Sequence, residues 1–284
     1  MPLVSTIELL RKAEAGGYAV GAFNCNNMEM VQAIVAAAEA ENAPVIIQAS
    51  QGAIKYAGLD YIVGLTKIAA NKSSIPIALH LDHGTSFEQC IQCILAGFTS
   101  VMIDGSKLPL AENINLTNRV LRAARAVGVP VEAELGKIGG TEDDIVVSER
   151  EAFFTDPLEA KEFVQSTGVD FLAVAIGTAH GRYKGIPRLN FELLKNIRAL
   201  INVPIVLHGS SGVPDISIRK AISLGVSKVN IDTNIREAFV EAARMVIHNK
   251  PEEIDPRKFL GPARDAVTDL IREKIRLFGS SGKA

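Results

Sequence analysis

The sequence predicts an α/β fold, a (β/α)₈ TIM barrel that occupies residues 1–284 as one domain, with an extra N-terminal helix and extended C-terminal helices. Three observations predict it. The chain has 284 residues, close to the ~250 typical of such barrels. Short apolar runs alternate eight times with helical patterns, which implies parallel strands joined by right-handed crossovers. Polar residues gather where these runs end, and in a barrel those ends share one face.

The first helix is predicted over Thr6 to Ala15, with Ser5 as its N-cap and Gly16-Gly17 ending it. Near-continuous apolar runs, several of them opened by a proline, then indicate strands buried on both faces. The predicted strands are Tyr18 to Phe23, Val45 to Ile47, Ile77 to Asp82, Thr99 to Ile103, Val131 to Leu135, Phe171 to Ile176, Ile205 to Leu207 and Val226 to Ile231.

Apolar residues at helical spacing predict a helix after every strand. These helices are Met28 to Glu41, Leu59 to Ala70, Phe87 to Ala96, Asn113 to Val127, Leu158 to Ser166, Phe191 to Leu200, Ile216 to Leu224 and Asn234 to His248, and a last one runs from Pro262 to Leu277. A doubly wound open sheet is the alternative, but no G-x-G-x-x-G follows the first strand. The longest irregular segment is Gly136 to Phe154, and loops of that length are usually functional or mobile.

Composition excludes several classes of protein. Lys+Arg 30 against Asp+Glu 32 gives 30 − 32 = −2, so no global field favours nucleic acid or an anionic membrane. No signal peptide or membrane-spanning run is apparent, and we expect a soluble, cytoplasmic protein. Three cysteines, Cys25, Cys90 and Cys93, argue against a disulfide scaffold. Cys90 and Cys93 lie in a helical pattern, which favours helix packing over redox or zinc chemistry.

Three histidines follow the third, sixth and seventh predicted strands: His83, His180 and His208. On one barrel face they would converge, and three neutral imidazoles with an open position suit a catalytic Zn²⁺. The alternative is three separate, hydrogen-bonded loop residues. His80 lies inside a strand and is expected in the core or behind the ligands, and His248 on the outer surface.

Two glycine-rich segments adjoin these histidines. Gly181 follows His180, and Gly209, Ser210 and Ser211 follow His208. Backbone N–H groups in such loops can hold a phosphate, often after the seventh and eighth barrel strands. The segment Asn230-Ile231-Asp232-Thr233, after the eighth strand, can supply further donors. Ordinary loop geometry is the alternative explanation for the glycines.

Carboxylates at the same rim suggest proton transfer. Asp82 precedes His83 and can reach a substrate hydroxyl, while Glu142 on the long loop can approach as a base. Glu142 also begins an acidic run whose alternative is a solvated surface loop. Glu134 and Asp104 end the fifth and fourth strands, either as alternate metal ligands or as hydrogen-bonded rim acids.

Taken together, these segments resemble the class II, zinc-dependent ketose-bisphosphate aldolases, a family with fructose- and tagatose-bisphosphate branches. The matching segments extend over essentially the whole chain. They are Tyr18 to Asn24, His80 to Gly84, Ser100 to Gly105, Glu132 to Gly136, Gly177 to Gly181, His208 to Gly212 and Lys228 to Thr233. The resemblance implies a (β/α)₈ barrel that cleaves a sugar bisphosphate, reversibly, to dihydroxyacetone phosphate and glyceraldehyde 3-phosphate.

The resemblance also implies roles for single residues. His83, His180 and His208 would hold Zn²⁺. Asp82 would be the acid/base that acts on the substrate C4 hydroxyl, and Glu142 would be the base on the mobile loop. Glu134 and Asp104 would be alternate metal ligands. Substrate-binding candidates are Asn24, Ser50, Gly181, Lys184, Gly209, Ser210, Ser211, Asn230, Ile231, Asp232, Thr233 and Arg257. Family members are homodimers or homotetramers and use a monovalent cation (Na⁺ or K⁺) near the phosphate.

Four alternative assignments make different demands on the sequence. The segment Asp255 to Arg264 favours the fructose branch, although Val174 to His180 fits the tagatose branch equally. A Schiff-base aldolase needs a lysine at a strand end, whereas Lys228 lies inside a strand. A non-catalytic barrel subunit would lack the ligands and acids. An amidohydrolase would need His-x-His after the first strand, where Phe23-Asn24-Cys25 stands.

Overall fold

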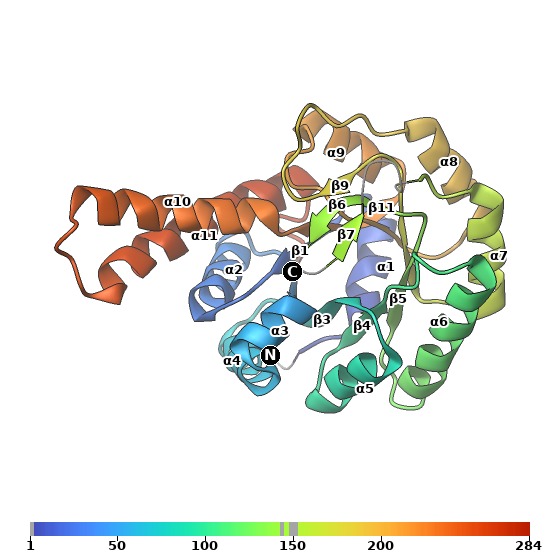
Figure 1. Ribbon diagram of the computed structural model, residues 1–284, viewed down its shortest axis with the longest axis horizontal. Coiled ribbons are helices and arrows are strands. Elements are labelled where there is room, and N and C mark those ends of the chain that lie inside the picture. The colour runs from blue at the N-terminus through green and yellow to red at the C-terminus, as the bar shows by residue number, and fades with distance from the viewer. Residues whose placement is uncertain (1–2, 143–144, 148–152) are drawn as a thin grey trace.

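The computed structural model describes residues 3–142, 145–147 and 153–284 and shows a closed barrel of parallel strands (Figure 1). The strand order around the barrel is β1-β11-β10-β8-β5-β4-β3-β2. The barrel strands are β1 (Val20–Asn24), β2 (Val45–Ser50), β3 (Ile77–Gly84), β4 (Ser100–Ile103), β5 (Val131–Leu135), β8 (Phe171–Val174), β10 (Ile205–Leu207) and β11 (Val226–Ile231). The predicted fold class and all eight predicted strands are confirmed.

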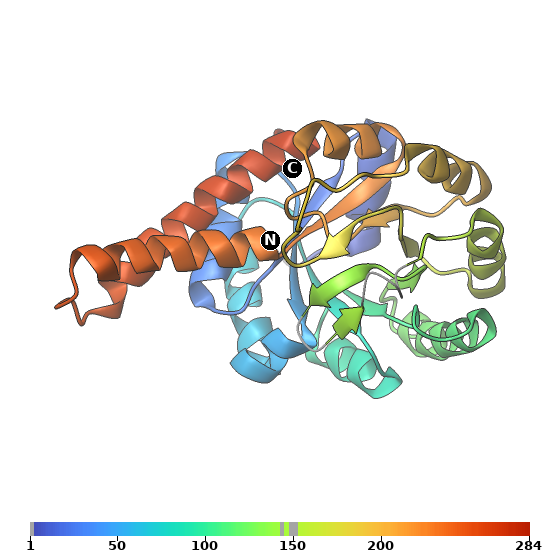
Figure 2. The same ribbon diagram turned by 45° about the horizontal axis from the view of Figure 1, so that its top comes forward.

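Helices surround the barrel on the outside (Figures 1 and 2). They are α2 (Met28–Ala40), α3 (Gln51–Ala57), α4 (Leu59–Lys72), α5 (Phe87–Ala96), α6 (Leu110–Arg125), α7 (Pro157–Thr167), α8 (Phe191–Leu200), α9 (Asp215–Ser223), α10 (Thr233–Asn249) and α11 (Pro256–Phe278). The short α3 was not predicted; Ser50 caps it by accepting a hydrogen bond from the Ala53 N–H. Among the described residues no helix is long and apolar enough to cross a bilayer. All three cysteines are buried and free, and Cys90 and Cys93 pack into the core from α5, as predicted.

The predicted extra N-terminal helix is α1 (Thr6–Gly16), and it packs against the barrel interior. Its apolar residues Leu9 and Leu10 belong to one cluster with inward-facing strand residues such as Ile46 and Phe171. The Thr6 hydroxyl lies 2.6 Å from that of Ser100 on β4. The N-terminal half of the interior is therefore filled and apolar, so chemistry is confined to the opposite end.

The two C-terminal helices form a hairpin that projects from the barrel (Figures 1 and 2). The last helix begins at Pro256 and not at Pro262, because Asp255 caps it and proline is well tolerated in the first turn. Pro262 lies within this helix. From the far end of the hairpin α11 returns to the barrel and packs along α2.

In the described parts of the segment from Gly136 to Phe154, short strands take the place of the predicted irregular loop. Strands β6 (Gly139–Glu142) and β7 (Ile145–Val147) form an antiparallel pair, and β6 pairs in parallel with β9 (Ala179–His180). Gly140 lies opposite His180, and a Cβ there would come within 2.1 Å of the His180 carbonyl oxygen. The glycine that looked like a loop residue instead allows this close strand pairing.

The carboxylate of Glu41, at the end of α2, anchors α11 to α2. It accepts hydrogen bonds from Arg276 Nη2 at 2.7 Å, from Arg272 Nε at 3.0 Å and from the Ser281 hydroxyl at 3.0 Å. The Arg276 hydrogen bond, with smaller contributions from Arg272 and Ser281, outweighs burial and lowers the pKa of Glu41 from 4.5 to about 2. The ionised form is therefore the one that the fold stabilises.

Replacing Glu41 by glutamine is expected to lower the melting temperature at neutral pH. Because the pKa of Glu41 is depressed in the folded state, its contribution is complete above pH 4.5 and is lost as pH falls towards 2. The melting temperatures of parent and Glu41→Gln should therefore converge between pH 7 and pH 3. Glu39→Gln, an exposed neighbour on the same helix, is the control. A melting-temperature difference independent of pH would contradict this role.

Candidate active site

A layer of buried polar side chains fills the C-terminal half of the barrel. Alternate strand residues face the interior, and many of them here are polar and buried. They include Asn24, Gln48, His80, Asp82, Glu132, Lys228 and Asn230, and the buried His208 directly follows β10. Buried polar groups need hydrogen-bond partners, and these residues supply one another with many of them, while Gln48 Oε1 and Asn230 Oδ1 accept no hydrogen bond from the described residues. The arrangement fixes each side chain before any ligand enters.

A bulge in β3 brings two consecutive residues, Asp82 and His83, to the same site. Successive residues of a regular strand point to opposite faces. Here the pairing of β3 with β4 shifts register between Leu81 and Gly84, and His83 adopts a left-handed backbone conformation with φ of 50°. Gly84 is required beside it, because a Cβ would come within 2.5 Å of the Met102 carbonyl oxygen. Asp82 thus faces inward, and the His83 ring turns to the rim.

His83, His180 and His208 meet at this rim, and a ring nitrogen from each lies within 4.8 Å of the others. The ring centroids of His83 and His208 are 4.7 Å apart, and those of His83 and His180 are 5.0 Å apart. The loops carrying His180 and His208 are joined by Tyr183, whose hydroxyl accepts from the Ala179 N–H and donates to the Gly209 carbonyl. The predicted convergence is present in the structure.

Neighbouring carboxylates set the protonation of two of these rings. His83 Nδ1 lies 3.2 Å from Asp104, and His208 Nε2 lies 2.7 Å from Glu132. A carboxylate accepts, so each of these nitrogens carries the proton. The remaining nitrogens, His83 Nε2 and His208 Nδ1, then face each other as lone pairs 2.9 Å apart. A cation relieves that repulsion, and the neutral imidazole set fits Zn²⁺.

The acids behind the histidines are held ionised, although burial opposes this. At Asp104 the hydrogen bond from His83 and two bonds from Ser106 overcome burial and keep its pKa below the ordinary range. At Glu132, Lys228 and the hydrogen bonds from His208 and His80 do the same, and its pKa lies well below 4.5. Burial lowers the pKa of His208, which keeps its ring neutral for a metal.

Asp82 is buried at the centre of three amide donors. Its Oδ2 accepts from Asn24 Nδ2 at 2.8 Å and from Gln48 Nε2 at 3.2 Å, and its Oδ1 accepts from Asn230 Nδ2 at 3.2 Å. Gln48 also donates to Asn24 Oδ1 at 2.6 Å, which orients the Asn24 amide. A carboxylate held this rigidly beside the histidine cluster is well placed to exchange a proton with a substrate hydroxyl.

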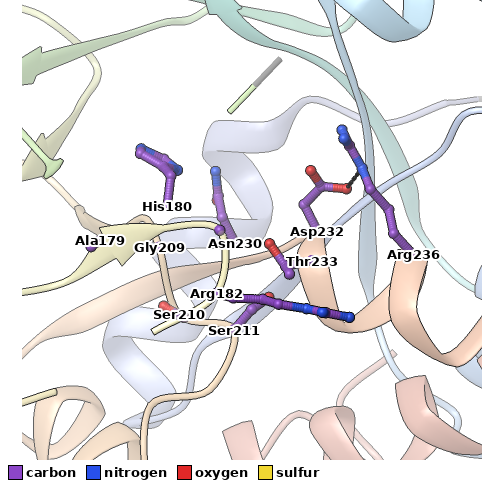
Figure 3. Close-up of a pocket in the computed structure, with 11 residues that line it drawn as sticks. Ala179, His180, Arg182, Gly209, Ser210, Ser211, Asn230, Asp232, Thr233 and Arg236 are labelled. Carbon is purple, nitrogen blue, oxygen red and sulfur yellow. Dashed lines mark hydrogen bonds and ion pairs between the residues drawn. The ribbon is translucent and has the colours of Figure 1, made fainter. Parts of the chain in front are cut away.

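A pocket of about 230 Å³ adjoins the histidines (Figure 3). Its lining contains most of the predicted phosphate loops together with two arginines. The lining residues are Ala179, His180, Gly181, Arg182, Gly209, Ser210, Ser211, Asn230, Asp232, Thr233 and Arg236. Gly209 has φ of 60° and approaches the Ala179 backbone, so no side chain fits there. The pocket has the donors and the size that a phosphate needs.

Comparison with known proteins decides the family. The sequence model described as "Fructose-bisphosphate aldolase class-II" matches residues 4–283. The chain belongs to the class II fructose-bisphosphate aldolase family. The fructose-bisphosphate aldolase of Geobacillus stearothermophilus is 49% identical, covering 100% of this chain and 99% of that protein. That of Thermus caldophilus is 46% identical, covering 99% of this chain and 100% of that protein.

Solved structures agree with this family assignment. The YdjI aldolase from Escherichia coli K12 superimposes with a TM-score of 0.86 at 36% sequence identity, covering 99% of each chain. The predicted resemblance to class II aldolases is thereby confirmed, and so is the predicted enzyme class, a lyase. Members of this family are generally zinc-dependent, and the histidine cluster is a group of residues able to hold a metal.

Some predicted site residues of this aldolase-family chain lie away from the pocket. Ile231 packs in the apolar core, and Lys184 is exposed in the loop after Gly181. Arg257 pairs with Asp255 at the far end of the projecting hairpin, with 88% of its side chain exposed. Ser50 is buried and lies beside Asp82 in the strand register.

The remaining candidates are acids. Glu134 and Asp104 form a second possible metal group with His83, their oxygens and its nitrogen lying within 4.8 Å of one another. The backbone of Glu142 ends β6, opposite Ile145, while its side chain lies outside the described part of the chain. Asp143 and Asp144, which continue the acidic run that begins at Glu142, also lie outside the described residues.

Sequence reasoning missed five residues that shape this site: Gln48, Glu132, Lys228, Arg182 and Arg236. The first three have a detectable signal, because each lies two residues before a predicted rim residue on the same strand and so faces the same way. Arg236 lies four residues after Asp232 and pairs with it at 2.8 Å. Arg182 directly follows Gly181 in a predicted phosphate loop, and this position is the signal that could have identified it.

Proposed function

We propose that this chain catalyses the reversible cleavage of fructose 1,6-bisphosphate to dihydroxyacetone phosphate and glyceraldehyde 3-phosphate. The observation that carries the proposal is the convergence of His83, His180 and His208 beside the buried Asp82 and next to a phosphate-sized pocket. The relatives named fructose-bisphosphate aldolase support fructose over the C4-epimeric tagatose bisphosphate. A glycolytic or gluconeogenic role in the cytoplasm is part of the same proposal.

The proposed metal is Zn²⁺, held by His83, His180 and His208, with Glu134 and Asp104 as alternate ligands. When bound, it supplies a Lewis acid that polarises the substrate carbonyl. Asp104 and Glu132 orient two of the ligand rings through their other nitrogens. Such outer hydrogen bonds fix the tautomer and raise the basicity of the ligand.

Proton transfer is assigned to two carboxylates. In the cleavage direction Asp82 removes the proton of the C4 hydroxyl, and in synthesis it returns that proton to the new alkoxide. The amides of Asn24, Gln48 and Asn230 hold its carboxylate in place for both directions. Glu142 is assigned the transfer of the carbon-bound proton of dihydroxyacetone phosphate. The pairing of β6 with β9 supports this role, because it brings the strand that ends at Glu142 beside His180.

The phosphate of dihydroxyacetone phosphate is assigned to the pocket of Figure 3. Backbone N–H groups of Gly181 and of Gly209 to Ser211 are the proposed donors, assisted by the Asn230 to Thr233 segment and a monovalent cation. Arg236 neutralises Asp232, whose carboxylate would otherwise repel the phosphate. Arg257 is exposed on the projecting hairpin, which supports a homo-oligomer in which it serves a neighbouring subunit.

Replacing Arg236 by glutamine is expected to raise the KM for fructose 1,6-bisphosphate by about tenfold, the loss typical of one charged hydrogen bond. Two effects act in the same direction: the guanidinium is lost from the pocket, and Asp232 loses its partner. The measurement is KM together with the inhibition constant of inorganic phosphate. Arg244→Gln, two turns further along α10, is the matched control. An unchanged phosphate inhibition constant in Arg236→Gln would show that Arg236 does not bind the phosphate.

Chelation tests the proposed reaction directly. Dialysis against a chelator is expected to abolish cleavage of fructose 1,6-bisphosphate, and stoichiometric Zn²⁺ is expected to restore it. The same preparation assayed with tagatose 1,6-bisphosphate tests the epimer, and the fructose substrate should have the higher kcat/KM. Full activity in the metal-stripped protein would exclude the metal assignment, while a preference for tagatose would correct the substrate alone.

A further inference from the structure

A single glutamine side chain holds the β3 bulge from outside. Gln51 is the first residue of α3, and its Nε2 donates to the His83 carbonyl oxygen at 2.7 Å and to the Thr85 hydroxyl at 2.9 Å. Pairing between β2 and β3 runs in register as far as Ser50 and Asp82. Gln51 follows Ser50, and His83 follows Asp82. The register of the two strands therefore places Gln51 beside the bulge.

His83 is the residue of the bulge that needs support. Its φ of 50° is a left-handed conformation that costs free energy for any residue with a Cβ. Relaxation to an ordinary extended conformation would return the ring to the outer face of β3, since neighbours in a strand face opposite ways. The His83 ring would then lose its position beside His180 and His208.

Hydrogen bonds hold the bulge on both of its sides. On the β4 side, the Asp104 N–H donates to the Gly84 carbonyl at 2.7 Å. On the β2 side, the hydrogen bonds from Gln51 are side-chain bonds, made where the chain has already turned into α3. The side chain of one residue therefore does what a continuing strand would do.

We infer that Gln51 is a positioning residue for His83. By donating to the His83 carbonyl it stabilises the left-handed backbone, and through it the direction of the imidazole towards the other two histidines. Gln51 acts through the main chain, since its Nε2 donates to the His83 carbonyl oxygen. The inference rests on the proposed metal role of His83 but is independent of which sugar the protein cleaves.

The test is the Gln51→Leu variant, which keeps the side-chain size and removes both donors. Its zinc affinity, measured by competition with a chromophoric chelator, is expected to fall about tenfold, the lower end of losses seen for outer partners of metal ligands. With Co²⁺ in place of zinc, the visible absorption spectrum should change in position or intensity. Gln51→Glu, which also lacks the donor when ionised, should weaken zinc binding as well.

Two controls separate this role from a general loss of stability. Thr85→Val removes the second acceptor but keeps the bond to His83, so it should bind zinc almost as the parent does. Gln92→Leu changes an exposed glutamine of α5 and should have no effect. Melting temperatures of the metal-free Gln51→Leu and parent proteins should lie close together.

Zinc affinity and a cobalt spectrum equal to those of the parent in Gln51→Leu would overturn the inference. A weaker affinity with an unchanged spectrum would also overturn it, because the ligand geometry would then not depend on Gln51. Neither readout uses a sugar substrate. Failure of the parent to cleave fructose 1,6-bisphosphate would refute the proposed function and leave these results standing.

Discussion

Replacing Asp82 by alanine is expected to lower kcat for fructose 1,6-bisphosphate cleavage by about 10²- to 10⁴-fold, the range that a positioned acid or base contributes. Zinc should still bind, since His83, His180 and His208 keep their ring nitrogens and their outer partners Asp104 and Glu132. The measurements are kcat and the bound zinc per chain. The expected pattern is therefore a fully metallated protein that turns over very slowly.

A second variant distinguishes the loss of the proton acceptor from a loss of packing around Asp82. Alanine leaves the amides of Asn24, Gln48 and Asn230 without their shared acceptor, whereas Asp82→Asn retains the shape but cannot take the proton. Both variants should be slow. Asp60→Asn, an exposed acid of α4, is the control. Near-normal turnover in Asp82→Asn would exclude Asp82 from proton transfer.

Replacing Lys228 by methionine is expected to lower the free energy of unfolding by about 3–5 kcal/mol, the cost of breaking a buried ion pair from one side. Lys228 Nζ donates to Glu132 Oε2 at 2.8 Å, and both side chains have no exposed surface. Without the lysine, Glu132 keeps a buried charge beside the histidines His80 and His208. Urea unfolding of the metal-free protein measures the loss.

The double variant Glu132→Gln/Lys228→Met distinguishes charge from packing. Removing both charges eliminates the unpaired carboxylate, so the double variant should be more stable than the sum of the single losses predicts. Lys220→Met, an exposed lysine of α9, should change stability little. If Lys228→Met unfolds within 1 kcal/mol of the parent, the pair does not stabilise the fold as the structure suggests. Zinc affinity of the same variants would report whether Glu132 still orients His208.

The eight-stranded barrel was predictable because each strand is a local pattern. The apolar runs that precede Asn24, Asp82 and Asn230 mark strands buried on both faces whatever their neighbours are. The helix Phe87–Ala96 could be predicted to its last residue, since a serine caps its start and a glycine in the left-handed region ends it. Elements with such signals depend little on tertiary contacts.

Two errors have different causes. The pairing of β6 with β9 joins Gly140 to His180, forty residues away, and nothing in the local sequence indicates that contact. The early start of α11 is set locally by the Asp255 cap and Pro256, in a segment with few apolar residues, so the periodic pattern missed a signal that the sequence contains. Long-range pairing explains the first error, and reliance on apolar periodicity explains the second.

The sequence by itself determined the barrel, the three rim histidines and the acid beside the first of them, because the carboxyl ends of parallel strands must share one face. Only the tertiary structure decided how Asp82 and His83, adjacent in the chain, both reach the site. It also showed that Glu132 and Lys228 support His208, and that Arg182 and Arg236 line the pocket. The physical reason is that strand periodicity fixes the face of each residue, whereas a left-handed bulge and buried ion pairs depend on partners far away in sequence.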